Sequence, residues 1–212
     1  MKINKKFKTS LRIPLQAVGL MWLVMLNSWI MDINLVSAGL YPRSLNGLIG
    51  IITAPFIHSS LEHLSSNSFP LIFLGTMSFY FYPRISKRVI LILVFLVGIL
   101  VWLFARPSYH IGASGIVYGL ASFIFFSGVF RKDIRSYALS FIILFLYGGI
   151  VEGLMPNQFG VSWESHLAGA VSGIVLAFIY RNTDRPKPEV ELYTAEEDNE
   201  FEYKYIPEDE EK

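Results

Sequence analysis

Long apolar stretches, separated by short clusters of basic residues, dominate this sequence. Six of them are long enough to cross the ~30 Å hydrocarbon core of a bilayer, and they fall at 14–32, 67–83, 89–105, 114–130, 137–154 and 166–180. In lipid, an unclosed segment satisfies its backbone polar groups only as a helix. The sequence therefore predicts an all-α membrane protein, with a bundle of six transmembrane helices over residues 14–181.

Basic residues indicate how this bundle is oriented. They cluster before the first span, after the second, after the fourth and after the sixth, whereas the opposite loops hold only Arg43 and Arg106. Because Lys and Arg are enriched in cytoplasmic loops, we expect both termini to be cytoplasmic, in a bacterial inner membrane. The clusters are Lys2, Lys5, Lys6, Lys8 and Arg12; Arg84, Lys87 and Arg88; Arg131, Lys132 and Arg135; and Arg181, Arg185 and Lys187.

The segments outside the six spans have distinct compositions. Residues 1–13 form a basic cytoplasmic N-terminus, and the acidic segment 182–212 has too little apolar surface to fold alone, so we expect a disordered cytoplasmic tail. The first span resembles a signal peptide ending near Val36, Ser37 and Ala38, but cleavage would remove a long span and break the charge pattern. Residues 41–58 are apolar but punctuated by proline and glycine, which favours a first outer loop lying in the membrane interface.

Polar residues within the spans are costly in a membrane and so indicate function. Ser114 and Asn67 each lie 17 residues before an arginine of the cytoplasmic side, and His166 lies 15 residues before Arg181. At 1.5 Å per residue these positions are about 22 to 25 Å from that side, which is ~5 to 8 Å below the outer surface. A serine, a histidine and an asparagine on three helices thus share one layer.

This layer contains the groups needed for acyl transfer. Ser114 opens a helix, after Gly112 and Ala113, where free backbone N–H groups can stabilise an oxyanion. A neutral His166 is suited to take the serine proton. With no cysteine in the chain, a thiolate nucleophile and a cysteine metal site are excluded. Small residues four apart would let the two helices pack closely, namely Gly115 and Gly119 on one and Gly169 and Gly173 on the other.

Further candidates surround this pair. His63 and Asn67, four residues apart, share a helix face and can each donate to an oxyanion. No carboxylate is placed to orient the base, and Tyr118, one turn below Ser114, is the candidate to pack against the imidazole ring. Each residue also has a structural interpretation. Asn67 could cap or bridge helices, His166 could be a structural hydrogen-bonding residue, Glu152 and Glu164 could make loop contacts, and His58 and His110 could be interfacial loop residues.

The order of these motifs resembles the rhomboid family of intramembrane serine proteases. The resemblance covers roughly 40–180 and rests on the segments 55–58, 63–67, 112–119 and 166–173. It implies a catalytic dyad of Ser114 and His166, with His63, Asn67 and Gly112 on the oxyanion side and Tyr118 stacked on the base. It also implies cleavage of transmembrane segments of other membrane proteins near their outer ends, with no metal and no cofactor. The acidic tail matches no motif of the family.

Two other functions remain open. A non-catalytic rhomboid-like protein would bind membrane segments without cutting them, but the serine and the histidine that such a protein would lack are both present. A small transporter would have interrupted spans with polar residues near the midplane, whereas here they gather at one outer level. The expected partners are transmembrane substrates and the lipid bilayer, and no nucleic acid, because the bases lie in short clusters between apolar runs. The oligomeric state is left open.

Overall fold

A computed structural model describes residues 4–156 and 161–185 of the chain. Within these ranges all regular secondary structure is helical. In chain order the elements are α1 (Lys5–Ile30), η1 (Leu35–Ala38), η2 (Asn46–Ile49), α2 (Gly50–Thr53), η3 (Ala54–Phe56), α3 (Leu61–Phe81), α4 (Ser86–Phe104), α5 (Ser114–Arg131), α6 (Ile134–Tyr147), η4 (Gly148–Leu154) and α7 (Trp163–Ile179).

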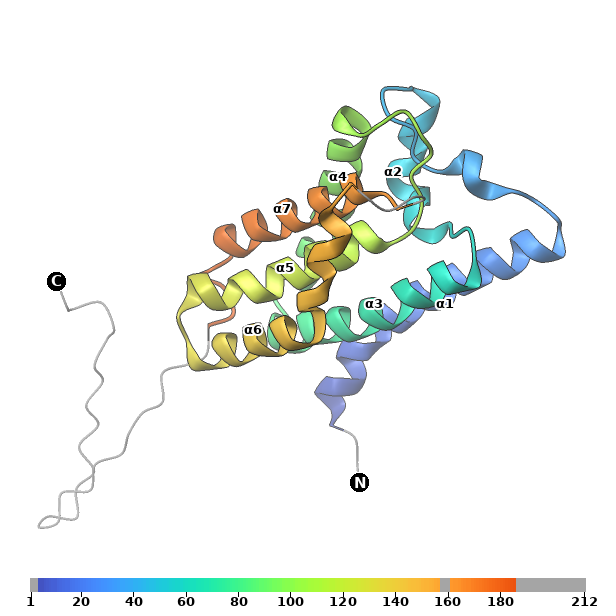
Figure 1. The fold of residues 1–212 in the computed structure, drawn as a ribbon. Helices are drawn as coiled ribbons and strands as arrows, with labels where there is room; N and C mark the ends of the chain where they lie inside the picture. The colour runs from blue at the N-terminus through green and yellow to red at the C-terminus, as the bar shows by residue number, and fades with distance from the viewer. Residues whose placement is uncertain (1–3, 157–160, 186–212) are drawn as a thin grey trace, which may run out of the picture.

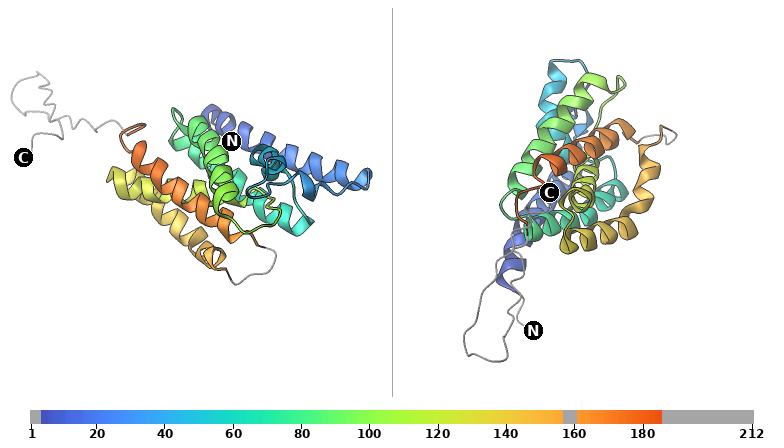
Figure 2. Two further views of the ribbon diagram at one scale, coloured as in Figure 1. Left: turned by 90° about the horizontal axis from the view of Figure 1, so that it is seen from above. Right: turned by 90° about the vertical axis from the view of Figure 1, so that its left-hand side faces the viewer.

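Helix α5 occupies the centre of the bundle. The end-on view in Figure 2 shows α3, α4, α6 and α7 arranged around it, with α1 outside α3. Its sequence suits this position, because buried residues lie on more than one side of the helix, among them Tyr118, Leu120 and Ala121. A helix that is apolar all round is expected to be enclosed by other helices. The first residue of this central helix is Ser114.

The closest helix pair is α5 and α7, which run side by side in Figure 1. A methyl group added at Gly169 would overlap the carbonyl oxygen of Gly115, and one at Gly173 would overlap that of Gly119. Lipid tails are as apolar as the helix surfaces, so close packing of small residues is a main source of helix association in membranes. The four glycines therefore do pack the helices together, as the spacing predicted.

The two glycines of α5 also make room for α4. A methyl group at Gly115 would lie 2.8 Å from Val97, and one at Gly119 would lie 2.6 Å from Leu93. The space that these glycines leave is thus filled by apolar side chains of a third helix. Close packing on both sides holds the start of α5 in a fixed position.

The loop between α1 and α3, which we expect on the outer side, is tied to the bundle by hydrogen bonds. Leu40 and His110 exchange backbone hydrogen bonds of 2.8 and 3.0 Å. The Arg43 guanidinium donates to the carbonyl oxygens of Leu103 and Ala105 at the end of α4, where free carbonyls need partners. Apolar side chains of the loop remain exposed, namely Leu45, Leu48, Ile49 and Ile52. That pattern is consistent with the expected interfacial loop.

Helix length and composition support part of the six-span prediction. Three helices of the described ranges are long and apolar enough to cross a membrane, α1, α4 and α5. Helix α3 has 21 residues, but its first turns carry a run of polar residues, from Glu62 to Ser68. Helices α6 and α7 are shorter apolar helices of 14 and 17 residues. The count of six spans stays a prediction.

Several helices differ from the expected spans in where they begin or end. The span predicted at 137–154 is not one helix, because α6 ends at Tyr147 and a 3-10 segment, η4, continues from Gly148. Helices α1, α3 and α7 begin earlier than predicted, since polar residues outside the apolar runs cap them. Asn4 accepts from the Lys6 N–H, Ser60 from the His63 N–H and Ser162 from the Ser165 N–H.

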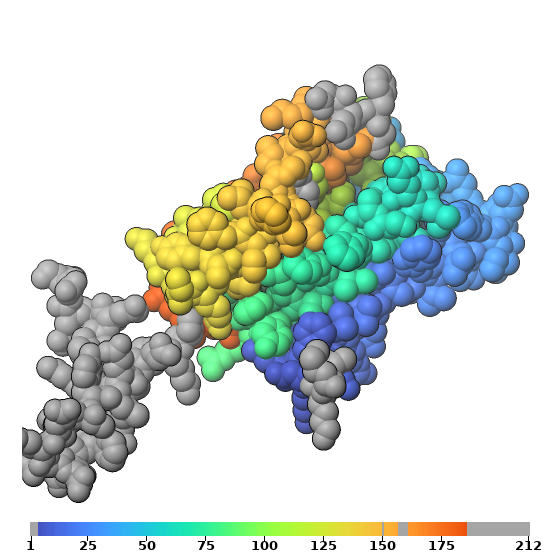
Figure 3. Space-filling view, turned by 60° about the horizontal axis from the view of Figure 1, so that its bottom comes forward, coloured from blue at the N-terminus to red at the C-terminus, as the bar shows by residue number. Residues whose placement is uncertain are grey.

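On the face shown in Figure 3, α1 lies along α3. Gly75 of α3 approaches Pro14 of α1, since a methyl group there would lie 2.9 Å from the proline ring. Toward α6, the rings of Phe73 and Tyr147 lie 6.1 Å apart. Helix α3, which carries His63 and Asn67, is therefore packed more closely against α1 than against α6.

The glycine contact between α5 and α7 yields a stability prediction. We expect Gly169→Ala to destabilise the protein by about 1 to 3 kcal/mol, because the added methyl overlaps the α5 backbone. Gly19→Ala is the matched control, since it is also in a helix and nothing lies within 4 Å of its added methyl. It should be neutral or stabilising by up to about 1 kcal/mol. Unfolding midpoints in detergent measure both, and equal midpoints would contradict the predicted contact.

Candidate active site

Ser114 stands at the first position of α5, after a turn that only glycine adopts easily. Gly112 has a φ of +96°, a left-handed value that strains any residue with a Cβ. Its N–H donates to the carbonyl oxygen of Ala54 over 2.8 Å, which fixes the turn against the first outer loop. Because the first N–H groups of a helix have no partner within the helix, the turn presents backbone donors beside the Ser114 side chain.

Ser114 lies directly against His166. The distance between Ser114 Oγ and His166 Nε2 is 2.9 Å, within the range of a hydrogen bond between a nucleophile and its base. His166 is 8% exposed and lies in the first turns of α7. Its ring stacks on that of Tyr118, with centroids 4.1 Å apart and planes at 9°. The two helices that the glycines bring together thus carry the serine and the histidine.

The second nitrogen of His166 is held by the main chain. His166 Nδ1 lies 2.7 Å from the carbonyl oxygen of Gly153 in η4. A carbonyl only accepts, so Nδ1 carries the hydrogen, and Nε2 is left to accept from the Ser114 hydroxyl. This is the tautomer that a general base requires. The sequence carried no signal for Gly153, because the orienting group is a backbone oxygen rather than a side chain.

His63 and Asn67 converge beside Gly112. A methyl group on Gly112 would lie 2.6 Å from His63 Nε2 and 3.8 Å from Asn67 Nδ2. Ser59 Oγ lies 3.4 Å from His63 Nδ1, which is compatible with an Nε2–H directed at Gly112. Both side-chain nitrogens therefore border the small space next to the turn that leads into Ser114.

Asn67 is 4% exposed, and its amide donates to the carbonyl oxygen of His63, 2.8 Å away in the same helix. That bond uses one of the two amide hydrogens. Within the described residues no hydrogen bond joins Asn67 to another helix, so the bridging interpretation has no support there. The second hydrogen of the amide is available to a group bound at Gly112.

The remaining polar candidates lie outside this cluster. Glu152 is exposed on η4, and Glu164 pairs with Arg106 at 3.6 Å. His58 and His110 lie in loops between helices, and both are buried against the rest of the protein. Burial, together with the neighbouring His63, lowers the pKa of His58 to about 4. Within the described ranges, no three His, Asp or Glu side chains gather as a metal site would require.

Comparison with known proteins identifies the class. Residues 45–183 match the family model described as the Rhomboid domain. The chain is 35% identical over 178 residues to uncharacterized proteins of Mycobacterium tuberculosis and Mycobacterium bovis, which covers 79% of this chain and 74% of each relative. An uncharacterized protein of Mycobacterium leprae is 32% identical over 181 residues, covering 79% and 70%.

The chain therefore belongs to the rhomboid family, as the motifs predicted. With its apolar helices, it is a membrane protein. The matched region contains both members of the Ser114–His166 pair, the turn at Gly112 and both polar residues of α3 that border it.

The carbonyl of Gly153 yields a prediction for the reactivity of the serine. A methyl group added at Gly153 would overlap Tyr118 Oη and lie 3.1 Å from His166 Nδ1. Displacing the imidazole by about 1 Å can cost roughly 10²-fold in rate, so Gly153→Ala should slow labelling of Ser114 by a fluorophosphonate by about that factor.

Gly149→Ala is the control for this measurement. It lies in the same 3-10 segment, with nothing within 4 Å of its added methyl, and should label at the wild-type rate. Equal labelling of both variants would show that the η4 carbonyl does not orient the base.

Proposed function

We propose that this chain is an intramembrane serine endopeptidase that hydrolyses peptide bonds in or near transmembrane segments of other membrane proteins. The observation that carries the proposal is the contact of 2.9 Å between Ser114 Oγ and His166 Nε2, with Gly153 fixing the required tautomer. Membership in the rhomboid family, generally one of serine proteases, supports the same reaction class.

In the proposed acylation step, His166 Nε2 takes the hydroxyl proton as Ser114 Oγ attacks the scissile carbonyl carbon. The negative charge that develops on the carbonyl oxygen is stabilised by the Ser114 N–H and by donors from His63 and Asn67. When the C–N bond breaks, protonated His166 gives its proton to the leaving amine. The acyl group remains on Ser114 as an ester.

In deacylation the same steps occur with water as the nucleophile. His166 takes a proton from the water as its oxygen attacks the ester carbon, and returns it to Ser114 Oγ as the new carboxyl product leaves. The stacked Tyr118 ring keeps the imidazole in one orientation through both steps. Since Gly153 supplies a neutral oxygen where soluble proteases use a carboxylate, we expect slow turnover, because loss of the third triad member can cost ~10⁴ in rate.

The proposed topology has six spans, both termini in the cytoplasm of a bacterium and the dyad near the outer surface of the inner membrane. Basic clusters at the opposite ends of the helices support this orientation. Substrates would be transmembrane segments with small residues before the scissile bond and a weak helix after it, as the resemblance implies. The alternative is a non-catalytic rhomboid-like binder, which a cleavage assay separates from a protease.

The test is cleavage of an unstable transmembrane segment by the purified protein in detergent, with products identified by mass. Ser114→Ala and His166→Ala should each abolish cleavage while the protein stays folded, because each removes the nucleophile or its activation. Ser122→Ala, a serine further along the same helix, should cleave normally, and a metal chelator should have no effect. Full cleavage by Ser114→Ala would end the serine-protease interpretation.

A second prediction concerns the proposed oxyanion donor Asn67. Asn67→Ala should lower kcat by roughly 10²-fold to 10³-fold with little change in KM, as loss of one preorganised donor typically does. Ser66→Ala is the control, because Ser66 also donates to the carbonyl oxygen of His63 but is exposed. A destabilised Asn67→Ala protein with near-normal turnover per folded molecule would remove Asn67 from the catalytic groups.

A further inference from the structure

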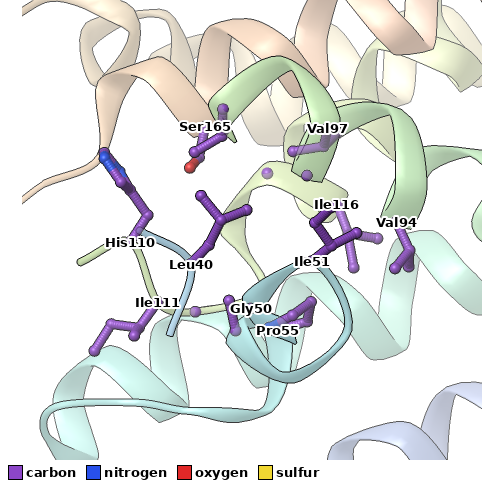
Figure 4. Close-up of a pocket in the computed structure, with 15 residues that line it drawn as sticks. Leu40, Gly50, Ile51, Pro55, Val94, Val97, His110, Ile111, Ile116 and Ser165 are labelled. Atoms are coloured by element: carbon purple, nitrogen blue, oxygen red, sulfur yellow. The ribbon is translucent and has the colours of Figure 1, made fainter. Parts of the chain in front are cut away.

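A second polar contact joins the loop before α5 to the start of α7. His110 Nδ1 lies 2.6 Å from Ser162 Oγ, and His110 is 4% exposed. His110 precedes Ser114 by four residues, and Ser162 precedes His166 by four. The contact therefore joins the same two segments as the proposed dyad, four residues earlier in each. Figure 4 shows His110 beside Ser165, both lining a small cavity of about 40 Å³.

The hydrogen-bond directions around His110 follow from its partners. His110 Nε2 lies 3.1 Å from the carbonyl oxygen of Arg106, which only accepts, so Nε2 carries the hydrogen in the neutral ring. Nδ1 then accepts from the Ser162 hydroxyl. Ser162 Oγ in turn lies 2.7 Å from the Ser165 hydroxyl. Burial lowers the pKa of His110, which favours this neutral ring.

Ser162 connects this network to the base. It is the N-cap of α7, and its carbonyl oxygen accepts from the backbone N–H of His166 at 3.2 Å and from that of Ser165 at 3.0 Å. The position of Ser162 therefore decides where the first turn of α7 begins. A shift of that residue would move the His166 backbone with it.

Charged groups on the same two elements make a weaker connection. Arg106 donates to the carbonyl oxygen of Val161 over 2.7 Å and pairs with Glu164 at 3.6 Å. The Arg106 side chain is 44% exposed, and exposed ion pairs contribute little. Arg106 and Glu164 are also the charges that act on His110, with opposite effects on its pKa. The contact from His110, which is 4% exposed, to the half-buried Ser162 is thus the stronger anchor, because its loss would leave a buried imidazole nitrogen unpaired.

We infer that His110 is a positioning residue, which holds the start of α7 through Ser162 and so sets the distance from His166 to Ser114. The inference rests on the proposed function. The segment that leads into α5 and the start of α7 are joined twice, at Ser114 and His166 and again four residues earlier at His110 and Ser162. Loss of the second link should leave the bundle folded, because the glycine contacts of α5 and α7 lie deeper, but it should loosen the dyad.

The experiment compares two substitutions at His110 in the full chain. His110→Leu removes the acceptor for Ser162 and should lower kcat by roughly 10-fold to 100-fold with less than about twofold change in KM. His110→Asn keeps an acceptor near the position of Nδ1 and should recover most of that loss. Tyr109→Leu, an exposed neighbour in the same loop, is the control and should cleave at the wild-type rate.

Ser162 provides the reciprocal pair. Ser162→Ala should lower kcat as His110→Leu does, and Ser162→Thr, which keeps the hydroxyl, should restore it. In the double variant the losses should not add, because the two residues act through one bond. These variants also keep the inference testable if His110→Leu does not fold.

The outcomes separate this inference from the proposed function. Absence of cleavage and of Ser114 labelling in the wild-type protein would overturn both. Cleavage by the wild type with equal kcat per folded molecule in His110→Leu or Ser162→Ala would overturn the inference alone. Equal loss in the Leu and Asn variants would also overturn it, since packing rather than the hydrogen bond would then account for the effect.

Discussion

The arrangement of the site depends on the close approach of the α5 and α7 backbones, which meet at glycines. Gly169 and Gly173 of α7 lie against the carbonyl oxygens of Gly115 and Gly119 in α5. In lipid the hydrophobic effect does not favour association of two apolar helices, so this contact is stabilised by van der Waals packing and hydrogen bonds. The contact begins within one turn of both Ser114 and His166, and their 2.9 Å separation follows from it. Larger residues at these positions would hold the two side chains apart.

Several buried polar residues on the helices that carry the site are satisfied within their own helix. Ser68 donates to the carbonyl oxygen of Leu64 and Ser172 to that of Ala168, each within its own helix. Asn67 does the same with one of its two amide hydrogens. A buried polar group without a partner is costly, and these bonds within one helix remove that cost. Ser68 also accepts from Trp22 Nε1 of α1 at 3.1 Å, which joins α1 to α3. The groups that face the proposed reaction are then held in place while part of their hydrogen-bonding capacity stays unused.

Much of this site could be predicted from the sequence because its side chains follow helical geometry. Counting residues from the basic clusters placed Ser114, Asn67 and His166 in one layer, and the spacing of the glycines predicted the close helix pair. Tyr118, one turn from Ser114, was expected against the imidazole and is stacked on it. Such relations can be predicted from residue spacing because a helix has a fixed rise and rotation per residue.

The contacts that the sequence did not predict are those made by the main chain and by loops. Gly153 acts through a carbonyl oxygen, which every residue has, and it lies in a 3-10 segment where a continuous helix was expected. His110 was expected in a loop, and loops usually lie at the surface. It lies in a loop but is buried, since the backbone pairing with Leu40 draws that loop against the bundle. Loop packing has no periodicity from which these positions could be predicted.

The group beside His166 Nδ1 is a backbone carbonyl rather than a carboxylate, which suits a site within a membrane. If the site lies at the proposed depth, an aspartate there would have to be desolvated as an ion, and charged side chains inside a bilayer are costly. The Gly153 carbonyl fixes the same tautomer at 2.7 Å without a charge, although it stabilises a protonated imidazole less than a carboxylate would. The Tyr118 ring, parallel to the imidazole at 4.1 Å, supplies the remaining orientation through its face. The His166 ring is therefore oriented by neutral groups, which are less costly than a charge in a low-dielectric environment, but its protonated form is stabilised less. For the proposed protease, this difference favours slow, selective cleavage over rapid turnover.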